Sequence, residues 1–286
     1  MAIKNYWLDA GDGGRLHIRD TGGDGMPILM LHGSSASGAV FARQFESPLA
    51  QRHRLIAIDL PGHGASDDAA EPEKAYAVNT FAGTISSAIA ALKIDRVVIF
   101  GWSLGGHVAL QMAPSNPAIA GILLCGTPPI ARGPLGLLRG FQKHWDMLLT
   151  TKAVFNESDA ERFARLCFGD EPEPAFVEAI RRADGRMRAH FFRSLLHGLG
   201  IDQKAFVESA DLPIGIINGD LDPFIRLTYI EDIGYRRLWR QRCHRIPAVG
   251  HAPFWHAPEL FNPLVQSFAA FAEEDIRARA YRRYVA

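Results

Sequence analysis

The most constraining feature of the chain is an apolar segment that runs directly into a glycine-rich turn. Residues 97–100 read Val-Val-Ile-Phe, and residues 101–106 read Gly-Trp-Ser-Leu-Gly-Gly. The continuous apolar run predicts a strand that is buried on both faces. The glycines let this strand and the following helix approach closely enough for a sharp turn. Such a G-x-S-x-G turn, a nucleophile elbow, would present the Ser103 hydroxyl alone above the edge of a sheet.

The same turn would also give Ser103 surroundings that suit a nucleophile. Its backbone would be strained, and the first N–H groups of the next helix would face any oxygen bound beside it. However, five-residue patterns with two glycines also occur in ordinary turns. The interpretation of Ser103 as a nucleophile therefore depends on what the rest of the chain places nearby.

Short apolar segments alternate with helical segments along most of the chain. Candidate buried strands lie at 27–31, 55–58, 97–100, 121–125, 213–217 and 243–247. Helices are predicted at 39–51 and 79–92, and Asn262-Pro263 predicts the start of the last helix. This alternation indicates a mostly parallel sheet flanked by helices on both faces. Residues 4–10 and 15–21 predict an antiparallel hairpin at one edge, turning at Gly11-Asp12-Gly13-Gly14.

The pattern changes after residue 127. Residues 128–205 contain several helical segments without a convincing strand, which we interpret as a helical cap inserted between core segments 1–127 and 206–286. One cap helix is predicted to begin at Ser158-Asp159-Ala160-Glu161, a capping box. Most leucines and phenylalanines of the cap would pack in its interior, and the remainder would line a pocket.

Composition excludes several classes of protein. The chain has 31 Lys and Arg against 31 Asp and Glu, so no net field attracts nucleic acid or an anionic membrane. A small neutral or apolar ligand fits better. The three cysteines, Cys125, Cys167 and Cys243, are widely spaced, which argues against a disulfide framework and a zinc site. The uncharged stretch 97–131 is interrupted by glycines and prolines, and residues 1–10 lack the apolar segment of a signal peptide. We therefore expect a cytoplasmic protein without a membrane span.

A serine nucleophile needs a base and an acid that orients the base. His251 follows the last predicted strand, where its imidazole would accept the Ser103 proton and return it to the leaving group. The acid should lie between serine and histidine in chain order. Asp220 and Asp222 both follow the strand at 213–217. Asp222 is favoured by its spacing from the preceding glycine, and Asp220 is the alternative, otherwise a turn residue.

A developing oxyanion needs two fixed donors. The backbone N–H of Leu104 and the backbone N–H of Ser34 are the candidates, and the hydroxyl of Ser34 or Ser35 would add a third donor. Gly33 leaves room for close approach. The sequence contains no carboxylate and histidine cluster typical of a metal site, and no phosphate-binding or nucleic-acid-binding motif. We expect neither a metal nor an organic cofactor.

Together these motifs resemble the α/β-hydrolase superfamily. The resemblance rests on His32-Gly33, Asp59-Leu60-Pro61-Gly62-His63-Gly64, Gly101-Trp102-Ser103-Leu104-Gly105-Gly106, Gly219-Asp220-Leu221-Asp222 and Gly250-His251. It implies an α/β-hydrolase fold over essentially the whole chain. A serine at position 103, rather than an aspartate, distinguishes the chain from the epoxide hydrolases and haloalkane dehalogenases of that fold.

Longer runs at 32–41, 100–107, 126–132, 218–224 and 250–254 resemble the metal-independent N-acyl homoserine lactone hydrolases, the quorum-quenching lactonases. This resemblance implies opening of a lactone ring by Ser103, His251 and Asp222, with substrate contacts from Gly33, Ser35, Trp102 and Phe163. The chain has Ser34 and Asp222 where these enzymes are expected to have asparagine and glutamate. Phe163 lies where some of them carry a cap tyrosine. The alternatives are a carboxylesterase, another small-lactone hydrolase, or a non-catalytic ligand receptor on the same fold.

Overall fold

A computed structural model describes residues 2–11 and 14–285. Within these residues, one sheet of eight strands has the order β1-β2-β4-β3-β5-β6-β7-β8. β1 pairs antiparallel with β2, β2 pairs antiparallel with β4, and all other neighbours are parallel. The strands are β1 (Lys4–Asp9), β2 (Arg15–Asp20), β3 (Ile28–Leu31), β4 (Leu55–Ile58), β5 (Val97–Trp102), β6 (Ile119–Cys125), β7 (Ile214–Gly219) and β8 (His244–Ile246).

The α/β-hydrolase sheet predicted from the sequence is confirmed. The six predicted apolar strands coincide with β3 to β8, and the edge hairpin coincides with β1 and β2. Asp12 and Gly13 of the predicted hairpin turn lie outside the described residues. Burial explains the agreement, because every residue of β3, β4, β5, β6 and β7 is buried and only continuous apolar segments satisfy such positions.

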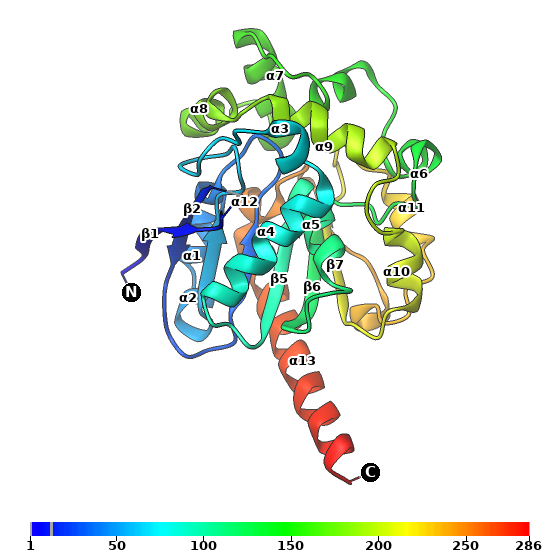
Figure 1. Ribbon diagram of the computed structural model, residues 1–286. Helices are drawn as coiled ribbons and strands as arrows, with labels where there is room; N and C mark the ends of the chain where they lie inside the picture. The colour runs from blue at the N-terminus through cyan, green and yellow to red at the C-terminus, as the bar shows by residue number, and fades with distance from the viewer. Residues whose placement is uncertain (1, 12–13, 286) are drawn as a thin grey trace.

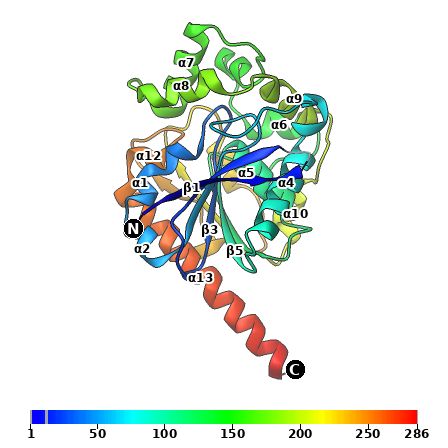
Figure 2. The same cartoon turned by 60° about the vertical axis from the view of Figure 1, so that its left-hand side comes forward.

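Helices cover both faces of the sheet (Figure 2). α4 and α5 lie with α10 on one face, and α1, α2, α12 and the first part of α13 lie on the other. Their bounds are α1 (Ala42–Phe45), α2 (Leu49–Arg52), α4 (Val78–Ala91), α5 (Leu104–Met112), α10 (Gln203–Ser209), α12 (Pro253–His256) and α13 (Pro258–Val285). The single helix predicted at 39–51 is wrong. A 3-10 turn, α1 and α2 replace it, because Pro48 has no N–H to continue a helical ladder.

Four helices from the predicted cap region lie above the carboxyl ends of the parallel strands (Figure 1). They are α6 (Pro134–Gly140), α7 (Glu157–Phe168), α8 (Pro174–Arg182) and α9 (Arg186–Leu196). The predicted capping box at Ser158 and Glu161 is wrong. The Asn156 side chain accepts from the Asp159 N–H at 2.8 Å, and the Asp159 carboxylate accepts from the Asn156 N–H at 2.9 Å. This pair starts the helix earlier and leaves Ser158 inside it.

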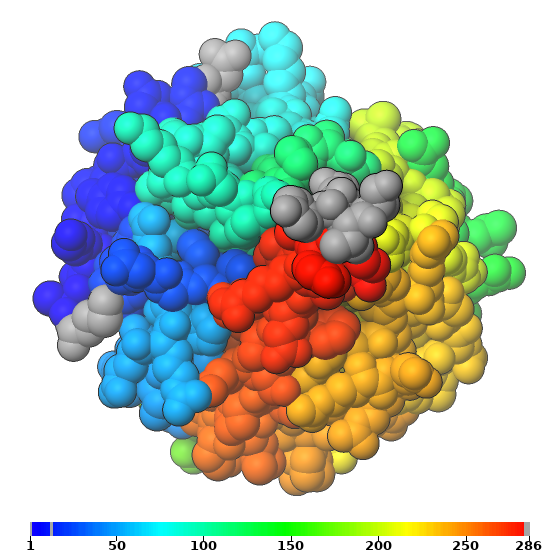
Figure 3. All heavy atoms as spheres, turned by 90° about the horizontal axis from the view of Figure 1, so that it is seen from below, coloured from blue at the N-terminus to red at the C-terminus, as the bar shows by residue number. Residues whose placement is uncertain are grey.

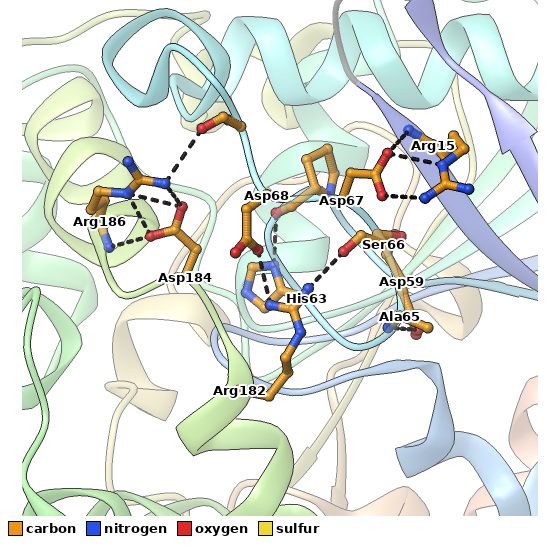
Figure 4. A network of polar contacts seen from close by, with 12 residues as sticks. Arg15, Asp59, His63, Ala65, Ser66, Asp67, Asp68, Arg182, Asp184 and Arg186 are labelled. Carbon is orange, nitrogen blue, oxygen red and sulfur yellow. Dashed lines mark hydrogen bonds and ion pairs between the residues drawn. The ribbon is translucent and has the colours of Figure 1, made fainter.

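A polar network attaches the corner between α8 and α9 to the loop after β4 (Figure 4). Arg182 donates to the Asp68 carboxylate at 2.9 Å and to the Ser66 carbonyl at 2.8 Å. Asp184 pairs with Arg186, and the buried Tyr76 hydroxyl donates to Asp184 at 2.6 Å. Exposed ion pairs individually contribute little to stability, but the Asp184 carboxylate here also accepts a hydrogen bond from the buried Tyr76 hydroxyl. The network therefore fixes α9 over the sheet.

The last helix begins earlier than predicted. α13 starts at Pro258, and Asn262 does not cap it but accepts from the Gln44 side chain at 2.8 Å. The end of α13 extends from the body on the side opposite the cap (Figure 1). The red part of this helix lies near the middle of the face seen in Figure 3. Along this end, Asp275 accepts from Arg279 at 2.6 Å, four residues later on the same helix. Over the residues described, no helix is both long and apolar enough to span a membrane.

Candidate active site

The turn between β5 and α5 has the strained geometry expected of a nucleophile elbow. Ser103 joins the two elements with φ 52° and ψ −116°. This backbone conformation costs a non-glycine residue about 1 to 3 kcal/mol. Its N–H donates to the Cys125 carbonyl at 2.8 Å, and its carbonyl accepts from the Thr127 hydroxyl at 2.7 Å. Cys125, the last residue of β6, and Thr127, two residues beyond it, thus hold the strained turn in place.

Close packing around the elbow predicts a large stability effect at Gly105. A Cβ there would lie 2.1 Å from the Leu31 carbonyl oxygen, so the backbone would have to move. We expect Gly105→Ala to lower the free energy of unfolding by about 3 kcal/mol, measured by urea denaturation. Gly83 in α4 is the matched control, because among the described residues no atom outside the adjacent turns of its own helix lies within 4 Å of an added Cβ. Gly83→Ala should stabilise the protein slightly. Equal unfolding midpoints for the two variants would contradict this packing argument.

The structure brings His251 together with Asp222. His251 follows β8 and Asp222 follows β7, and their Nδ1 and Oδ2 atoms are 2.7 Å apart. Both side chains are buried. The other Asp222 oxygen accepts from the backbone N–H groups of Phe224 at 2.8 Å and Ile225 at 3.3 Å. Among the described residues Asp220 makes no hydrogen bond to His251, and its buried Oδ1 has no partner. Of the two carboxylates left open by the sequence, Asp222 is the one paired with the imidazole.

Three residues fix the position of the His251 ring. The Trp102 indole N–H donates to the His251 carbonyl at 2.8 Å. The Phe224 ring packs against the imidazole, with 4.5 Å between ring centroids. Gly126 approaches so closely that a Cβ would lie 2.5 Å from the His251 Cε1. Phe224 and Gly126 were not predicted from the sequence as supports of His251. Gly126 follows the strand predicted at 121–125, and Phe224 lies in the loop that also carries Asp222.

A cavity of about 340 Å³ lies between the elbow and the cap. Ser103 and His251 line it together with five further residues predicted from the sequence: Gly33, Ser34, Trp102, Leu104 and Phe163. The rest of the wall comes mainly from apolar cap residues, which include Leu137, Phe141, Met147, Phe191, Phe192 and Leu195. An apolar chain therefore fits beneath the cap, with the polar groups gathered at the elbow.

The two serines of the loop after β3 have different environments. Ser35 has φ 60°, and its hydroxyl accepts from the Arg188 guanidinium at 2.7 Å. Ser35 is not among the residues that line the cavity, whereas Ser34 is. The Ser34 hydroxyl oxygen is buried without a hydrogen-bond partner in the described part of the chain. Ser34 therefore has the free hydroxyl, and Ser35 supports the loop.

Arg188 on α9 is a cavity residue that the sequence did not reveal. Its guanidinium donates to the Lys152 carbonyl at 2.7 Å and the Ala153 carbonyl at 3.2 Å, besides Ser35. Burial lowers the pKa of Arg188 to about 10. No carboxylate forms an ion pair with it among the described residues. One arginine among many carries no distinguishing sequence pattern, so only the fold identifies this connection between cap and loop.

Buried histidines predict acid sensitivity of the fold. Burial lowers the pKa of His63 to about 3 and that of His107 to about 4, so both stay neutral in the folded protein. The unfolded chain takes up these protons near pH 6.5. We therefore expect the free energy of unfolding to fall as the pH drops from 6.5 to 4. Urea denaturation across this range measures the slope, and His107→Phe should reduce it by about one proton. A free energy of unfolding that stays constant from pH 6.5 to pH 4 would contradict the conclusion that His63 and His107 are neutral in the folded protein.

The model of the alpha/beta hydrolase family matches residues 28–264. The chain belongs to the alpha/beta hydrolase family. A pimeloyl-[acyl-carrier protein] methyl ester esterase from Nitrosomonas europaea is 30% identical and covers 86% of this chain and 96% of its own. A 2-hydroxy-6-oxononadienedioate/2-hydroxy-6-oxononatrienedioate hydrolase from Cupriavidus pinatubonensis is 36% identical over 89% of this chain and 90% of its own.

Among solved structures of alpha/beta hydrolases, this chain is similar in fold to a lactonase. The N-acyl homoserine lactonase AidH in complex with N-butanoyl homoserine has a TM-score of 0.91 and 37% identity, covering 94% of this chain and 97% of that chain. An AidH mutant with N-hexanoyl homoserine lactone has a TM-score of 0.92 and 36% identity, covering 95% and 99%. The chain is thus an enzyme of the carboxylic-ester hydrolase class with a lactonase-like structure. Within the described residues, no group of three histidine, cysteine or acidic side chains is placed to hold a metal.

Proposed function

We propose that this hydrolase opens the lactone ring of N-acyl homoserine lactones, using a serine nucleophile and neither metal nor cofactor. The observation that carries the proposal is the likeness to the lactonase AidH over nearly the whole chain, cap included. The cavity supports it, because its volume of about 340 Å³ suits a small molecule. Its apolar wall suits an acyl chain. The substrate partner is a small lactone rather than nucleic acid or a membrane, and we assign the enzyme to the cytoplasm.

In this mechanism Ser103 attacks the lactone carbonyl carbon. His251 takes the hydroxyl proton through Nε2 and returns it to the ring oxygen when the carbon–oxygen bond breaks. Asp222 holds the other imidazole nitrogen and stabilises the imidazolium. The hydroxyl released by ring opening stays attached to the acyl group through the carbon chain of the former ring, so the acyl-enzyme carries the whole substrate. A water molecule, deprotonated by His251, then releases N-acyl homoserine and restores Ser103.

The oxyanion formed in each step would be bound at the start of α5. The backbone N–H groups of Leu104 and Ser34 are the two donors, and the unpartnered Ser34 hydroxyl is the third. Loss of one such donor typically costs about a hundredfold or more in rate. The Ser34 hydroxyl can donate a hydrogen bond to the oxyanion, as the side chain of the asparagine expected at this position of the loop in related lactonases would.

The cap would select the acyl chain. We propose that residues 128–205 form this cap as an insertion between core segments 1–127 and 206–286. We expect Phe163 on α7 and Trp102 on β5, which both line the cavity, to contact the substrate. Gly33 would allow the substrate to approach closely. Ser35 acts through Arg188 and the loop that carries Ser34, rather than by direct contact.

The second candidate is a carboxylesterase, which the similarity to the methyl ester esterase favours. A substrate panel separates the two. We expect kcat/KM to be highest for N-hexanoyl homoserine lactone and at least tenfold lower for γ-butyrolactone, p-nitrophenyl butyrate and 2-hydroxy-6-oxononadienedioate. A simple ester that is hydrolysed faster than the acylated lactone would establish the esterase instead. Binding of the lactone without turnover of any compound would indicate the receptor alternative.

A further inference from the structure

His107 is a polar side chain set among the apolar residues of the cavity wall. It lies on α5, one helical turn after Ser103, so the two Cα atoms are about 6 Å apart along the helix axis. Its ring packs beside Phe141 and Phe191, with centroid distances of 6.0 and 6.4 Å. All of these side chains line the cavity. A small molecule bound at Ser103 is therefore within reach of the His107 ring.

Gln203 on α10 determines which nitrogen of His107 carries the proton. The Gln203 Oε1 atom lies 2.8 Å from the His107 Nδ1. The amide nitrogen of the same side chain donates to the His107 carbonyl at 3.4 Å, which fixes the amide orientation. Its oxygen accepts, so Nδ1 must carry the hydrogen. Because burial lowers the pKa of His107 to about 4, the ring is neutral near pH 7 and Nε2 is a hydrogen-bond acceptor.

This acceptor has no partner in the described part of the protein. Every hydrogen bond of the His107 side chain there is made by Nδ1. Three other polar side chains of the same cavity, Gln142, Thr150 and Thr151, donate to backbone carbonyls. The Ser34 hydroxyl beside Ser103 is the other buried polar group of the cavity described above without a partner among the described residues. An acceptor in an apolar wall loses its bond to water when a ligand fills the cavity, which costs free energy unless the ligand brings a donor.

We propose that the His107 Nε2 accepts the amide N–H of an N-acyl homoserine lactone and so positions the lactone carbonyl at Ser103. This inference rests on the proposed function and adds a substrate requirement to it. The amide nitrogen is two covalent bonds, or about 2.5 Å, from the lactone carbonyl carbon. Its N–H is a donor that simple esters and unsubstituted lactones lack. His107 is thus a specificity residue that selects lactones with an amide at the α-carbon.

The test compares N-hexanoyl homoserine lactone with its carba analogue, in which a CH2 group replaces the amide N–H. We expect the wild-type enzyme to open the amide substrate with a kcat/KM about tenfold higher, the usual effect of one neutral hydrogen bond. His107→Phe should lower kcat/KM about tenfold for the amide substrate and leave the analogue within twofold. His107→Gln, which keeps an acceptor, should restore part of the preference.

Phe191→Leu is the matched control, because it alters the same wall without removing a polar atom and should affect both substrates alike. If His107→Phe does not fold, Gln203→Met tests the same point, since loss of the fixed tautomer should shrink the preference for the amide. The inference is overturned if the wild-type enzyme opens both lactones equally well, or if His107→Phe slows both by the same factor. Hydrolysis of simple esters with no opening of either lactone would instead overturn the proposed function itself.

Discussion

Ser103→Ala is expected to lower kcat for every accepted ester or lactone by about 10⁴-fold to 10⁶-fold, to the rate that oxyanion donors and substrate binding supply alone. The reason is chemical rather than structural. The elbow is held by backbone hydrogen bonds of Ser103, which an alanine at this position keeps. Only the hydroxyl is lost. Initial rates with N-hexanoyl homoserine lactone and with p-nitrophenyl butyrate measure the effect.

Two further variants separate chemistry from folding. Ser103→Gly should be equally inactive but more stable than Ser103→Ala by roughly 1 kcal/mol or more, because glycine adopts φ 52° without strain. Ser115→Ala, at an exposed position beyond the end of α5, should leave both activity and stability near those of the wild type. Turnover by Ser103→Ala within tenfold of the wild-type rate would refute the assignment of the nucleophile.

Asp222→Asn is the variant with the second largest expected effect, a loss of about 10⁴-fold in kcat. Asp222 accepts from the His251 Nδ1 at 2.7 Å. In the proposed mechanism this leaves the Nε2 lone pair free to take the Ser103 proton. An asparagine amide that donates to Nδ1 would reverse the tautomer, and Nε2 would then carry a hydrogen and accept no proton. The pH dependence of kcat and the unfolding free energy should be measured together, because the substitution replaces a buried carboxylate.

The neighbouring carboxylate provides the control for this experiment. Asp220→Asn should change kcat by less than tenfold, since Asp220 makes no hydrogen bond to His251 within the described residues. A larger loss in Asp220→Asn than in Asp222→Asn would reverse the assignment of the acid. Equal and small losses would show that the imidazole needs no carboxylate here.

Much of the fold could be predicted because burial limits the sequence so strongly. Strands such as β5, covered on both faces, require unbroken apolar segments, and the elbow requires glycines where strand and helix meet. The parallel arrangement of the sheet then places the loops that carry Ser34, Asp222 and His251 at one edge. For these residues, the sequence motifs and the sheet topology predict the same location.

The parts that could not be predicted depend on contacts between segments far apart in the chain. Arg188 reaches the loop of Ser35, 153 positions away, and no local pattern distinguishes it from other arginines. No local pattern distinguishes His107 from the other histidines, because its tautomer depends on Gln203, 96 positions later. The predicted start of α7 was wrong because the sequence offers two capping residues close together. Asn156, rather than Ser158, caps the helix.

The central claim is tested most directly by identifying the product that the enzyme forms from N-hexanoyl homoserine lactone by mass spectrometry. Our account predicts ring-opened N-hexanoyl homoserine from the wild-type enzyme, and no product above the uncatalysed level from Ser103→Ala. Free homoserine lactone with hexanoate would show an amidase. That result, or an intact lactone under conditions where the enzyme hydrolyses simple esters, would contradict the account.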